Sequence, residues 1–140
     1  MAHMSDAARE IGSQYLQVNE QVLGPDVVVF LVIGELDMMS APALRERVLD
    51  ELRQRKHVIL DFSAVGFLGS AGIQVLVEAN DAAIDNGATL HVAGAGGRVV
   101  ARPLQVTGVD ELLHLEPGSA MALGLRLLAG DGGSTDTAAR

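Results

Sequence analysis

The chain has 140 residues, a formal net charge of −8 at pH 7, a hydrophobic content of 49% and no cysteine. This length suits a single domain, and the negative charge argues against nucleic acid or an anionic membrane surface as the main partner. Without cysteine the chain can form neither a disulfide framework nor a thiolate metal site, which is consistent with a reducing cytoplasm.

The two ends of the chain differ in composition from the middle. Residues 1–4 read Met-Ala-His-Met and resemble a cloning remnant, so we expect residues 1–12 to be this remnant and a flexible N-terminus. Residues 130–140 are rich in Gly, Ser, Thr and Ala and predict a disordered tail. The domain is therefore expected over residues 13–129.

The first elements of the domain form a predicted hairpin. Residues 15–23 alternate imperfectly between apolar and polar side chains and predict an edge strand. Gly24-Pro25-Asp26 is a turn signal, and the continuous apolar run at residues 27–33 predicts a buried strand. This run is the longest in the chain and is far too short to cross a bilayer, so we expect no membrane insertion.

Two helices are predicted on either side of a second buried strand. Ser40 is a favourable N-cap and Pro42 suits a first turn, so a helix is expected from there to about Lys56. A strand follows at residues 58–65. The next helix starts after Ser70 and ends at Asn86-Gly87, where Gly87 is a left-handed C-cap.

The remaining elements complete an alternating pattern. We expect a strand at residues 89–93, a short helix at 98–106, a last short strand at 112–115 and a final helix after Ser119. Repeated alternation of strand and helix implies right-handed crossovers and a mostly parallel sheet, so the predicted fold class is α/β.

Candidate site residues follow the strands. In open α/β sheets ligands bind outside the carboxyl ends of the strands. Three segments of the chain lie at those ends, at residues 34–40, 66–72 and 94–98. The first segment supplies Glu35, Asp37 and Ser40, and the second supplies Ser70. Both segments lie on one rim if their strands are neighbours. The simpler interpretation is that both serines only cap helices.

Enzymatic interpretations have less support. A nucleophile elbow needs Gly two residues before the serine, and Leu68 stands there. The candidate bases are His57, His91 and His114. Of these, His57 lies at the opposite, amino-terminal end of its strand, and His91 lies in the middle of a strand. The Gly-rich residues 94–97 lack the last Gly of a nucleotide-binding loop. No cluster of metal ligands is visible, and we expect neither an enzyme nor a cofactor.

Three segments together resemble the STAS-domain family. Gly34-Glu35-Leu36-Asp37 followed by Ser40-Ala41-Pro42-Ala43-Leu44 is similar to that family's G-E-L-D…S-A-P-x-L segment. The stretch from Leu60 to Gly72 is similar to its central signature, and Thr107-Gly108-Val109-Asp110-Glu111-Leu112 matches its usual T-G-L-x-x-L ending. The similarity covers residues 15–128 in order, and the branch that fits best is the stand-alone anti-sigma factor antagonists.

The resemblance implies a fold and a regulatory role. The fold would be a small mixed sheet of four to five strands with about four helices packed mainly on one side. The partner would be an anti-sigma factor that is itself a serine kinase, and binding it would release a sigma factor. The family's phosphorylated serine falls on Ser70, and phosphorylation would end binding until a serine phosphatase reversed it. Many members carry Asp before that serine, where this chain has Gly69.

The expected contact surface lies around this serine. The partner-binding residues that we expect are Glu35, Asp37, Ser40, Phe67, Leu68, Gly69, Ser70, Gly72 and Ile73. A cytoplasmic location follows from this role. The alternative function is that of a STAS accessory subunit of a membrane lipid transporter, without phosphorylation.

Overall fold

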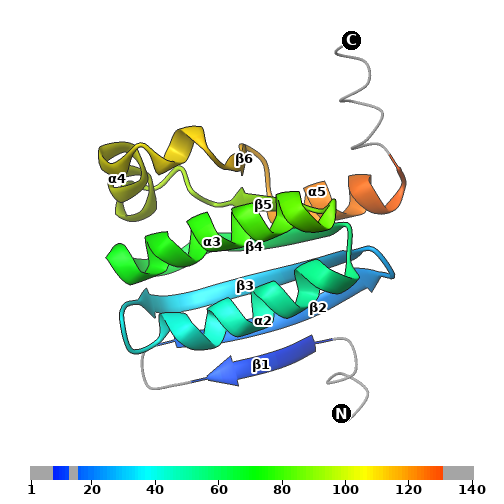
Figure 1. Cartoon of the computed structure of the whole chain (residues 1–140), viewed down its shortest axis with the longest axis horizontal. Helices are drawn as coiled ribbons and strands as arrows, with labels where there is room; N and C mark the ends of the chain where they lie inside the picture. Colours follow the sequence, from blue (N-terminus) through cyan, green and yellow to red (C-terminus); the bar gives the residue numbers. More distant parts are fainter. Residues whose placement is uncertain (1–7, 13–15, 131–140) are drawn as a thin grey trace.

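The computed structural model describes residues 8–12 and 16–130, which build a six-stranded sheet with its strands in sequence order. The strands are β1 (Ala8–Gly12), β2 (Leu16–Gly24), β3 (Val27–Leu36), β4 (His57–Leu68), β5 (Thr89–Ala93) and β6 (His114–Glu116). The helices are α2 (Ala41–Gln54), α3 (Ser70–Asn86), α4 (Arg98–Thr107) and α5 (Ala120–Leu128), with a 3-10 turn, η1, at Val109–Glu111. Figure 1 shows α2 and α3 side by side along the sheet.

The sheet is mixed, as the sequence predicts. Strands β1, β2 and β3 pair in antiparallel fashion, whereas β3, β4, β5 and β6 pair in parallel. Helices α2 and α3 supply the crossovers that parallel neighbours require. Leu36 at the end of β3 is paired with Leu68 at the end of β4. The segments that follow these two strands therefore share one rim of the sheet, as expected.

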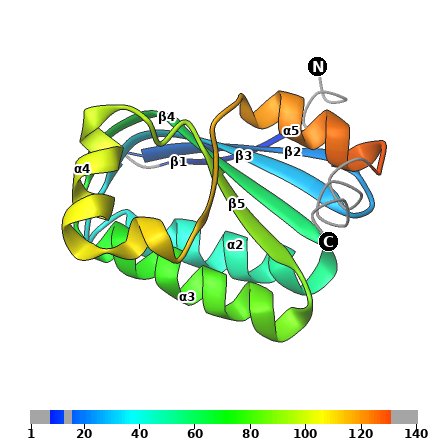
Figure 2. The same cartoon turned by 90° about the horizontal axis from the view of Figure 1, so that it is seen from above.

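Side chains of the central strands alternate between two cores. Val28, Phe30 and Val32 of β3 are fully buried in the larger core, to which α2, α3 and α4 contribute. Val27 and Val29 point to the smaller core beneath α5. Figure 2 shows α2 and α3 on one side of the sheet and α5 on the other. The helices thus pack mainly on one side, which confirms the predicted α/β architecture.

The strands differ from the prediction in extent. Residues 8–12, which the sequence assigned to a flexible N-terminus, form β1 and pair with β2, so the sheet is larger than the expected four to five strands. Residues 1–7 and 131–140, with the expected cloning remnant and most of the expected tail, lie outside the described residues. Strand β3 continues to Leu36 and β4 to Leu68, because their pairing resumes after bulges. The helix at 98–106 is confirmed with Pro103 inside it.

A buried ion pair fastens α2 to the sheet. The Glu20 side chain in β2 is 2% exposed, and Arg47 of α2 donates to both its oxygens, Nη2–Oε1 at 2.7 Å and Nε–Oε2 at 2.8 Å. These hydrogen bonds raise the pKa of Arg47 above its ordinary value. Glu51, also buried, accepts from Arg55 at 2.6 Å, and Arg55 donates to the carbonyl of Pro25. The orientation of α2 on the sheet is therefore fixed by charge as well as by apolar packing.

Candidate functional site

Ser70 is the first residue of α3, and one residue separates it from the end of β4. Gly69 between them has an extended backbone, with φ −94° and ψ −178°, and it occupies the N-cap position. The Gly69 N–H donates to the carbonyl of Leu36 at 3.0 Å, and Ile73 N–H donates to the Gly69 carbonyl at 3.1 Å. The predicted placement of Ser70 near a helix N-cap is confirmed. The first-turn N–H groups of the helix, with the positive end of its dipole, lie beside the serine.

The side chain of Ser70 is available to another molecule. The residue is exposed, and its hydroxyl has no hydrogen-bond partner within residues 16–130. Ser119 at the start of α5 differs, because its Oγ accepts from the Ala122 N–H at 3.0 Å and so caps the helix. The interpretation of Ser70 as a cap only is therefore wrong, and its hydroxyl can be reached from solvent.

Ser40, unlike Ser70, is buried, which corrects its prediction as a partner-binding residue. It is only 4% exposed, and its Oγ donates to the Glu35 carbonyl at 2.6 Å and accepts from the Asp37 N–H at 3.0 Å. The carboxylate of Asp37 instead accepts from the backbone N–H groups of Ser40 at 2.9 Å and Met39 at 3.0 Å. These bonds, that from Ser40 above all, lower the pKa of Asp37. Asp37 thus caps the turn before α2, and Ser40 is buried beneath it, out of a partner's reach.

The other expected contact residues divide by exposure. Glu35 and Phe67 are exposed together with Ser70, while Asp37, Gly69 and Ile73 are partly buried. Leu68 and Gly72 are buried, so neither belongs to an exposed surface, contrary to the prediction. A Cβ on Gly72 would come within 2.7 Å of Leu68 and 2.9 Å of Leu36. Gly72 therefore serves the close approach of α3 to the ends of β3 and β4.

The ring of Phe67 lies over Gly69, immediately before the serine. Phe67 is 49% exposed, and a Cβ on Gly69 would come within 2.9 Å of its ring. A glycine at position 69 therefore leaves room for an aromatic ring next to Ser70. The space that an aspartate would need at position 69 is partly filled by Phe67.

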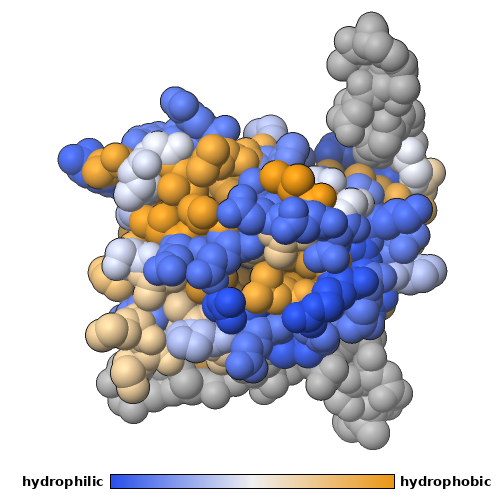
Figure 3. Space-filling view, in the orientation of Figure 1, coloured by the Kyte–Doolittle hydropathy of each residue, from blue (hydrophilic) through white to orange (hydrophobic). Residues whose placement is uncertain are grey.

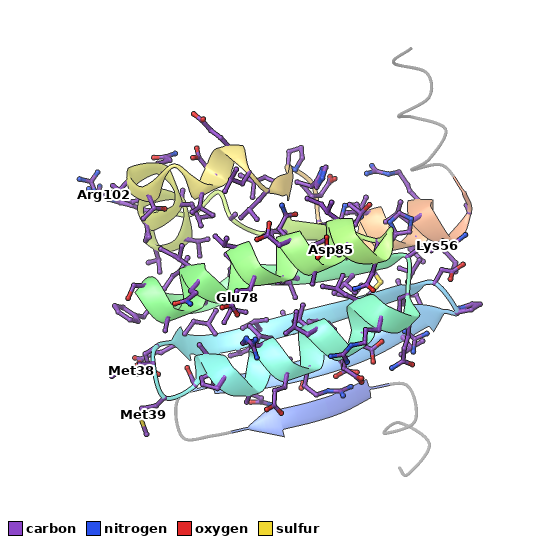
Figure 4. All side chains as sticks on the ribbon, viewed as in Figure 1. Met38, Met39, Lys56, Glu78, Asp85 and Arg102 are labelled. Carbon is purple, nitrogen blue, oxygen red and sulfur yellow. The ribbon has the colours of Figure 1, made fainter. Side chains whose placement is uncertain are left out.

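Two methionines missed by the sequence analysis extend the exposed surface. Met38 and Met39, in the loop between β3 and α2, are 75% and 82% exposed. Figure 4 shows both projecting from the end of the molecule at which α2 and α3 begin. Their signal in the sequence is a pair of long apolar side chains between a strand and a helix. Methionine is a flexible side chain that adapts to varied protein surfaces.

A shallow groove of about 490 Å³ runs between α2 and α3 and opens beside Ser70. Figure 3 shows hydrophobic residues between the two helices, flanked by hydrophilic residues. The residues that line it are Met38, Ala41, Pro42, Arg45, Ser70, Ala71, Gln74, Val75 and Glu78. The groove therefore joins the predicted serine to a surface that neither helix forms alone.

The polar end of this groove is an ion pair across the two helices. Arg45 Nε of α2 lies 2.5 Å from Glu78 Oε1 of α3, and Gln74 Nε2 donates to Glu78 Oε2 at 3.2 Å. The hydrogen bond from Arg45 is the largest cause that lowers the pKa of Glu78. The groove thus passes from apolar side chains near Ser70 to a pair of opposite charges.

The histidines considered as candidate bases lie away from the serine. His57 opens β4 and Ser70 follows its end, so they occupy opposite edges of the sheet. His57 Nδ1 lies 3.1 Å from His91 Nε2, and the rings of His91 and His114 are 6.3 Å apart. Burial, followed by the neighbouring rings, lowers the pKa of His91 to about 4. The three histidines form a row across β4, β5 and β6 without contributing to the site.

The remaining alternatives have simple structural counterparts. The Gly94 backbone approaches β4 so closely that a Cβ there would lie 2.4 Å from Ser63 N. This close packing explains the first glycine of residues 94–97. Within residues 8–12 and 16–130, no group of three or more His, Asp or Glu side chains could hold a metal ion. No helix in that part of the chain is long and apolar enough to cross a membrane.

Comparisons with known proteins agree with this geometry. A family model described as STAS domain matches residues 17–122. The chain is 33% identical over 90 residues to the anti-sigma-F factor antagonist RsfB of Mycobacterium tuberculosis, covering 64% of this chain and 72% of that protein. The crystal structure of an anti-sigma factor antagonist from Mycobacterium paratuberculosis has a TM-score of 0.69 at 29% identity, covering 81% and 96% of the two chains.

A more distant structure has the same fold. SpoIIAA, an anti-sigma factor antagonist solved in its unphosphorylated form, has a TM-score of 0.66 at 14% identity, with 81% of this chain and 96% of that chain covered. The chain described here belongs to the STAS-domain family. Its relatives place it among the anti-sigma factor antagonists of that family, which confirms the resemblance seen in the sequence.

Proposed function

We propose that this protein binds an anti-sigma factor with serine kinase activity and thereby releases a sigma factor, and that phosphorylation of Ser70 ends this binding. The observation on which the proposal depends is the Ser70 hydroxyl, exposed at the start of α3 and without a partner in residues 16–130. A kinase can reach such a hydroxyl, transfer the γ-phosphoryl group of ATP to its oxygen and release ADP. The protein itself acts as a binding partner in the cytoplasm.

The proposed contact surface surrounds this hydroxyl. Phe67 and the two methionines, Met38 and Met39, supply exposed apolar area, and Glu35 supplies an exposed negative charge. Asp37, Gly69 and Ile73 contribute at its edge. Large apolar side chains at the centre of an interface typically dominate its affinity. The buried residues Ser40, Leu68 and Gly72 support this surface from beneath.

Phosphorylation would act on the interface and leave the fold in place. The phosphate adds a charge of about −1.5 to −2 at pH 7. The N-terminus of α3 accommodates an anion, so the helix itself is not destabilised. A partner that must lose water around this position then faces new bulk and charge. Disrupting a buried polar contact of an interface typically costs about 2–5 kcal/mol, or roughly 30- to several-thousand-fold in affinity.

Gly69 affects how the kinase engages the site. Many members of the family have aspartate before the serine, and this chain has the Phe67 ring over a glycine. The kinase would therefore meet an aromatic face at this position, where a carboxylate is more usual. We expect the partner of this protein to present an apolar side chain to Phe67.

The experiment pairs phosphate mapping with binding. The protein is incubated with the candidate anti-sigma kinase and ATP, and the phosphate is located by mass spectrometry. Ser70→Ala should bind the kinase with wild-type affinity, whereas Ser70→Asp should bind at least tenfold more weakly, about 1.4 kcal/mol. Phosphate at another residue, or equal binding by both variants, would contradict the proposal.

Ser119→Asp provides a matched control. Ser119 is an exposed serine at the start of α5, on the opposite face of the sheet. Aspartate is an equally good N-cap, so this variant adds the same charge without disturbing its helix. Its affinity for the kinase should equal that of the wild type.

A serine phosphatase should restore binding to the protein phosphorylated at Ser70.

A further inference from the structure

The groove beside Ser70 contains a cation that its proposed phosphate would meet. Among the groove-lining residues, all within residues 16–130, Arg45 is the only cationic side chain. It projects from α2, and its guanidinium is bound to Glu78 of α3. Figure 4 shows Glu78 on the side of α3 that faces α2. Arg45 and Ser70 thus border one open space from two different helices.

We propose that Arg45 is the internal receptor for a phosphate on Ser70 and that phosphorylation transfers this guanidinium from Glu78 to the phosphoserine. This inference rests on the proposed function, because it assumes that Ser70 is the phosphorylated residue. It adds that the phosphate is first recognised within this protein, by α2, before any partner responds to it.

The geometry of the two helices favours this exchange. Ser70, Gln74 and Glu78 are spaced four residues apart and so lie in one row along the face of α3 that borders the groove. Helical side chains lean toward the N-terminus of their helix, which for Arg45 is the end at which Ser70 lies. Because Arg45 and Ser70 line the same groove, the long Arg45 side chain would leave Glu78 and meet the phosphate by turning along the groove toward the start of α3.

The contacts that hold Arg45 at present are weak enough to be exchanged. Its side chain is 47% exposed and that of Glu78 is 37% exposed, so solvent screens the pair. A phosphate carries more charge than a carboxylate and offers three acceptor oxygens to the planar guanidinium. The phosphate is also held by the first-turn N–H groups of α3, so it is a fixed target. The exchange is therefore favourable.

The exchange would change the shape and charge of the groove. In the unmodified protein, Arg45 and Glu78 neutralise each other at its far end. After the exchange, the guanidinium crosses the groove beside Met38 and Pro42, and the Glu78 carboxylate loses its cation. A partner segment that fills the groove would then meet an obstructed, more negative surface. Partner release would depend on Arg45 as well as on the phosphate itself.

The test is a ³¹P NMR titration of the protein carrying phosphoserine at position 70, installed during translation so that no kinase is needed. An exposed phosphoserine has a second pKa of about 6. We expect a lower value in the wild type, an increase of roughly half a unit in Arg45→Gln, and a further decrease in Glu78→Gln, which frees Arg45. Arg45→Lys keeps the charge without the planar fork and should fall between wild type and Arg45→Gln.

Arg53→Gln is the control for a general loss of charge. Arg53 lies on the same helix, is 64% exposed and pairs with Asp50, away from the groove. The phosphate on Ser70 of the Arg53→Gln variant should have the same second pKa as in the wild type. Equal titration of the wild type and Arg45→Gln would overturn the inference about Arg45 even if phosphorylation of Ser70 releases the partner. Failure of the kinase to modify Ser70 would contradict the proposed function. The titration would still decide whether Arg45 binds a phosphate at position 70, because it needs no kinase.

Discussion

Removing Arg47 should destabilise the protein far more than removing any exposed arginine of the same helix. Arg47→Met keeps most of the apolar stem of the side chain but leaves the Glu20 carboxylate, 2% exposed, without its two hydrogen bonds at 2.7 and 2.8 Å. Breaking a buried ion pair by deleting one partner typically costs about 3–5 kcal/mol. A domain of this size has a total stability of about 5–15 kcal/mol, so the loss is a large fraction of it.

Urea unfolding followed by circular dichroism measures this loss. With an m-value of about 1.5 kcal/mol/M, the unfolding midpoint of Arg47→Met should fall by roughly 2–3 M. The double variant Glu20→Leu/Arg47→Met removes both charges and should recover most of the stability, because no uncompensated charge remains. Arg53→Met, which breaks only the exposed pair with Asp50, should change stability by less than about 0.5 kcal/mol. A midpoint of Arg47→Met close to that of Arg53→Met would refute the reasoning.

Three other changes test contacts elsewhere in the fold, each by urea unfolding. Gly94→Ala would place a Cβ 2.4 Å from Ser63 N at a φ of +72° and should cost about 2 kcal/mol, whereas Gly96→Ala, with open space, should be nearly neutral. The pKa of His91 is about 4 in the folded protein, against 6.5 in the unfolded chain, so the unfolded chain takes up the proton at a higher pH. The contribution of His91 to the free energy of unfolding is therefore complete above about pH 6.5, and up to about 3 kcal/mol of it is lost as the pH falls from 6.5 through 4. His91→Gln should show a shallower loss over that range. Ser119→Ala removes the cap of α5 and should cost about 1 kcal/mol, with faster amide exchange at Ala122.

Hydrophobic runs predicted the central strands, because a strand that is buried on both faces has a continuous apolar segment in its sequence. Strands β3 and β4 were found from their continuous apolar segments. Their last residues were missed, since Gly34 has a φ of +113° and the pairing of β3 with β4 shifts register there. Strand β1 was missed because its sequence, AREIG, lacks a run of apolar residues. Edge pairing of this kind depends on the neighbouring strand, which local composition does not reveal.

In the candidate site, features set by neighbouring residues in the sequence were predictable, whereas features that depend on contacts between distant segments were not. The strand-to-helix turn at Ser70 was predictable, because the glycines and the serine mark it locally. Ser40 occupies the predicted N-cap position of α2, but its Oγ bonds the Asp37 N–H and the Glu35 carbonyl, and Asp37 accepts from the Ser40 N–H. This exchange was not predictable, because two good capping residues three positions apart can each bond the backbone of the other. The groove was not predictable, since its ion pair joins residues 33 positions apart, Arg45 and Glu78, on two helices whose adjacency only the fold establishes.

The frame around Ser70 determines what a charge at this position can change. The Gly69 N–H is bound to Leu36, and Gly72 packs against Leu36 and Leu68, so the start of α3 is fixed from within. Ser70 itself is exposed, and its hydroxyl makes none of these contacts. A negative charge there is favourable to the helix dipole by about 0.3–1 kcal/mol. Ser70→Asp should therefore be as stable as the wild type or slightly more stable in urea, while its affinity for the anti-sigma kinase falls. A loss of stability of about 2 kcal/mol or more in this variant would indicate that the charge acts by unfolding α3, not at the interface.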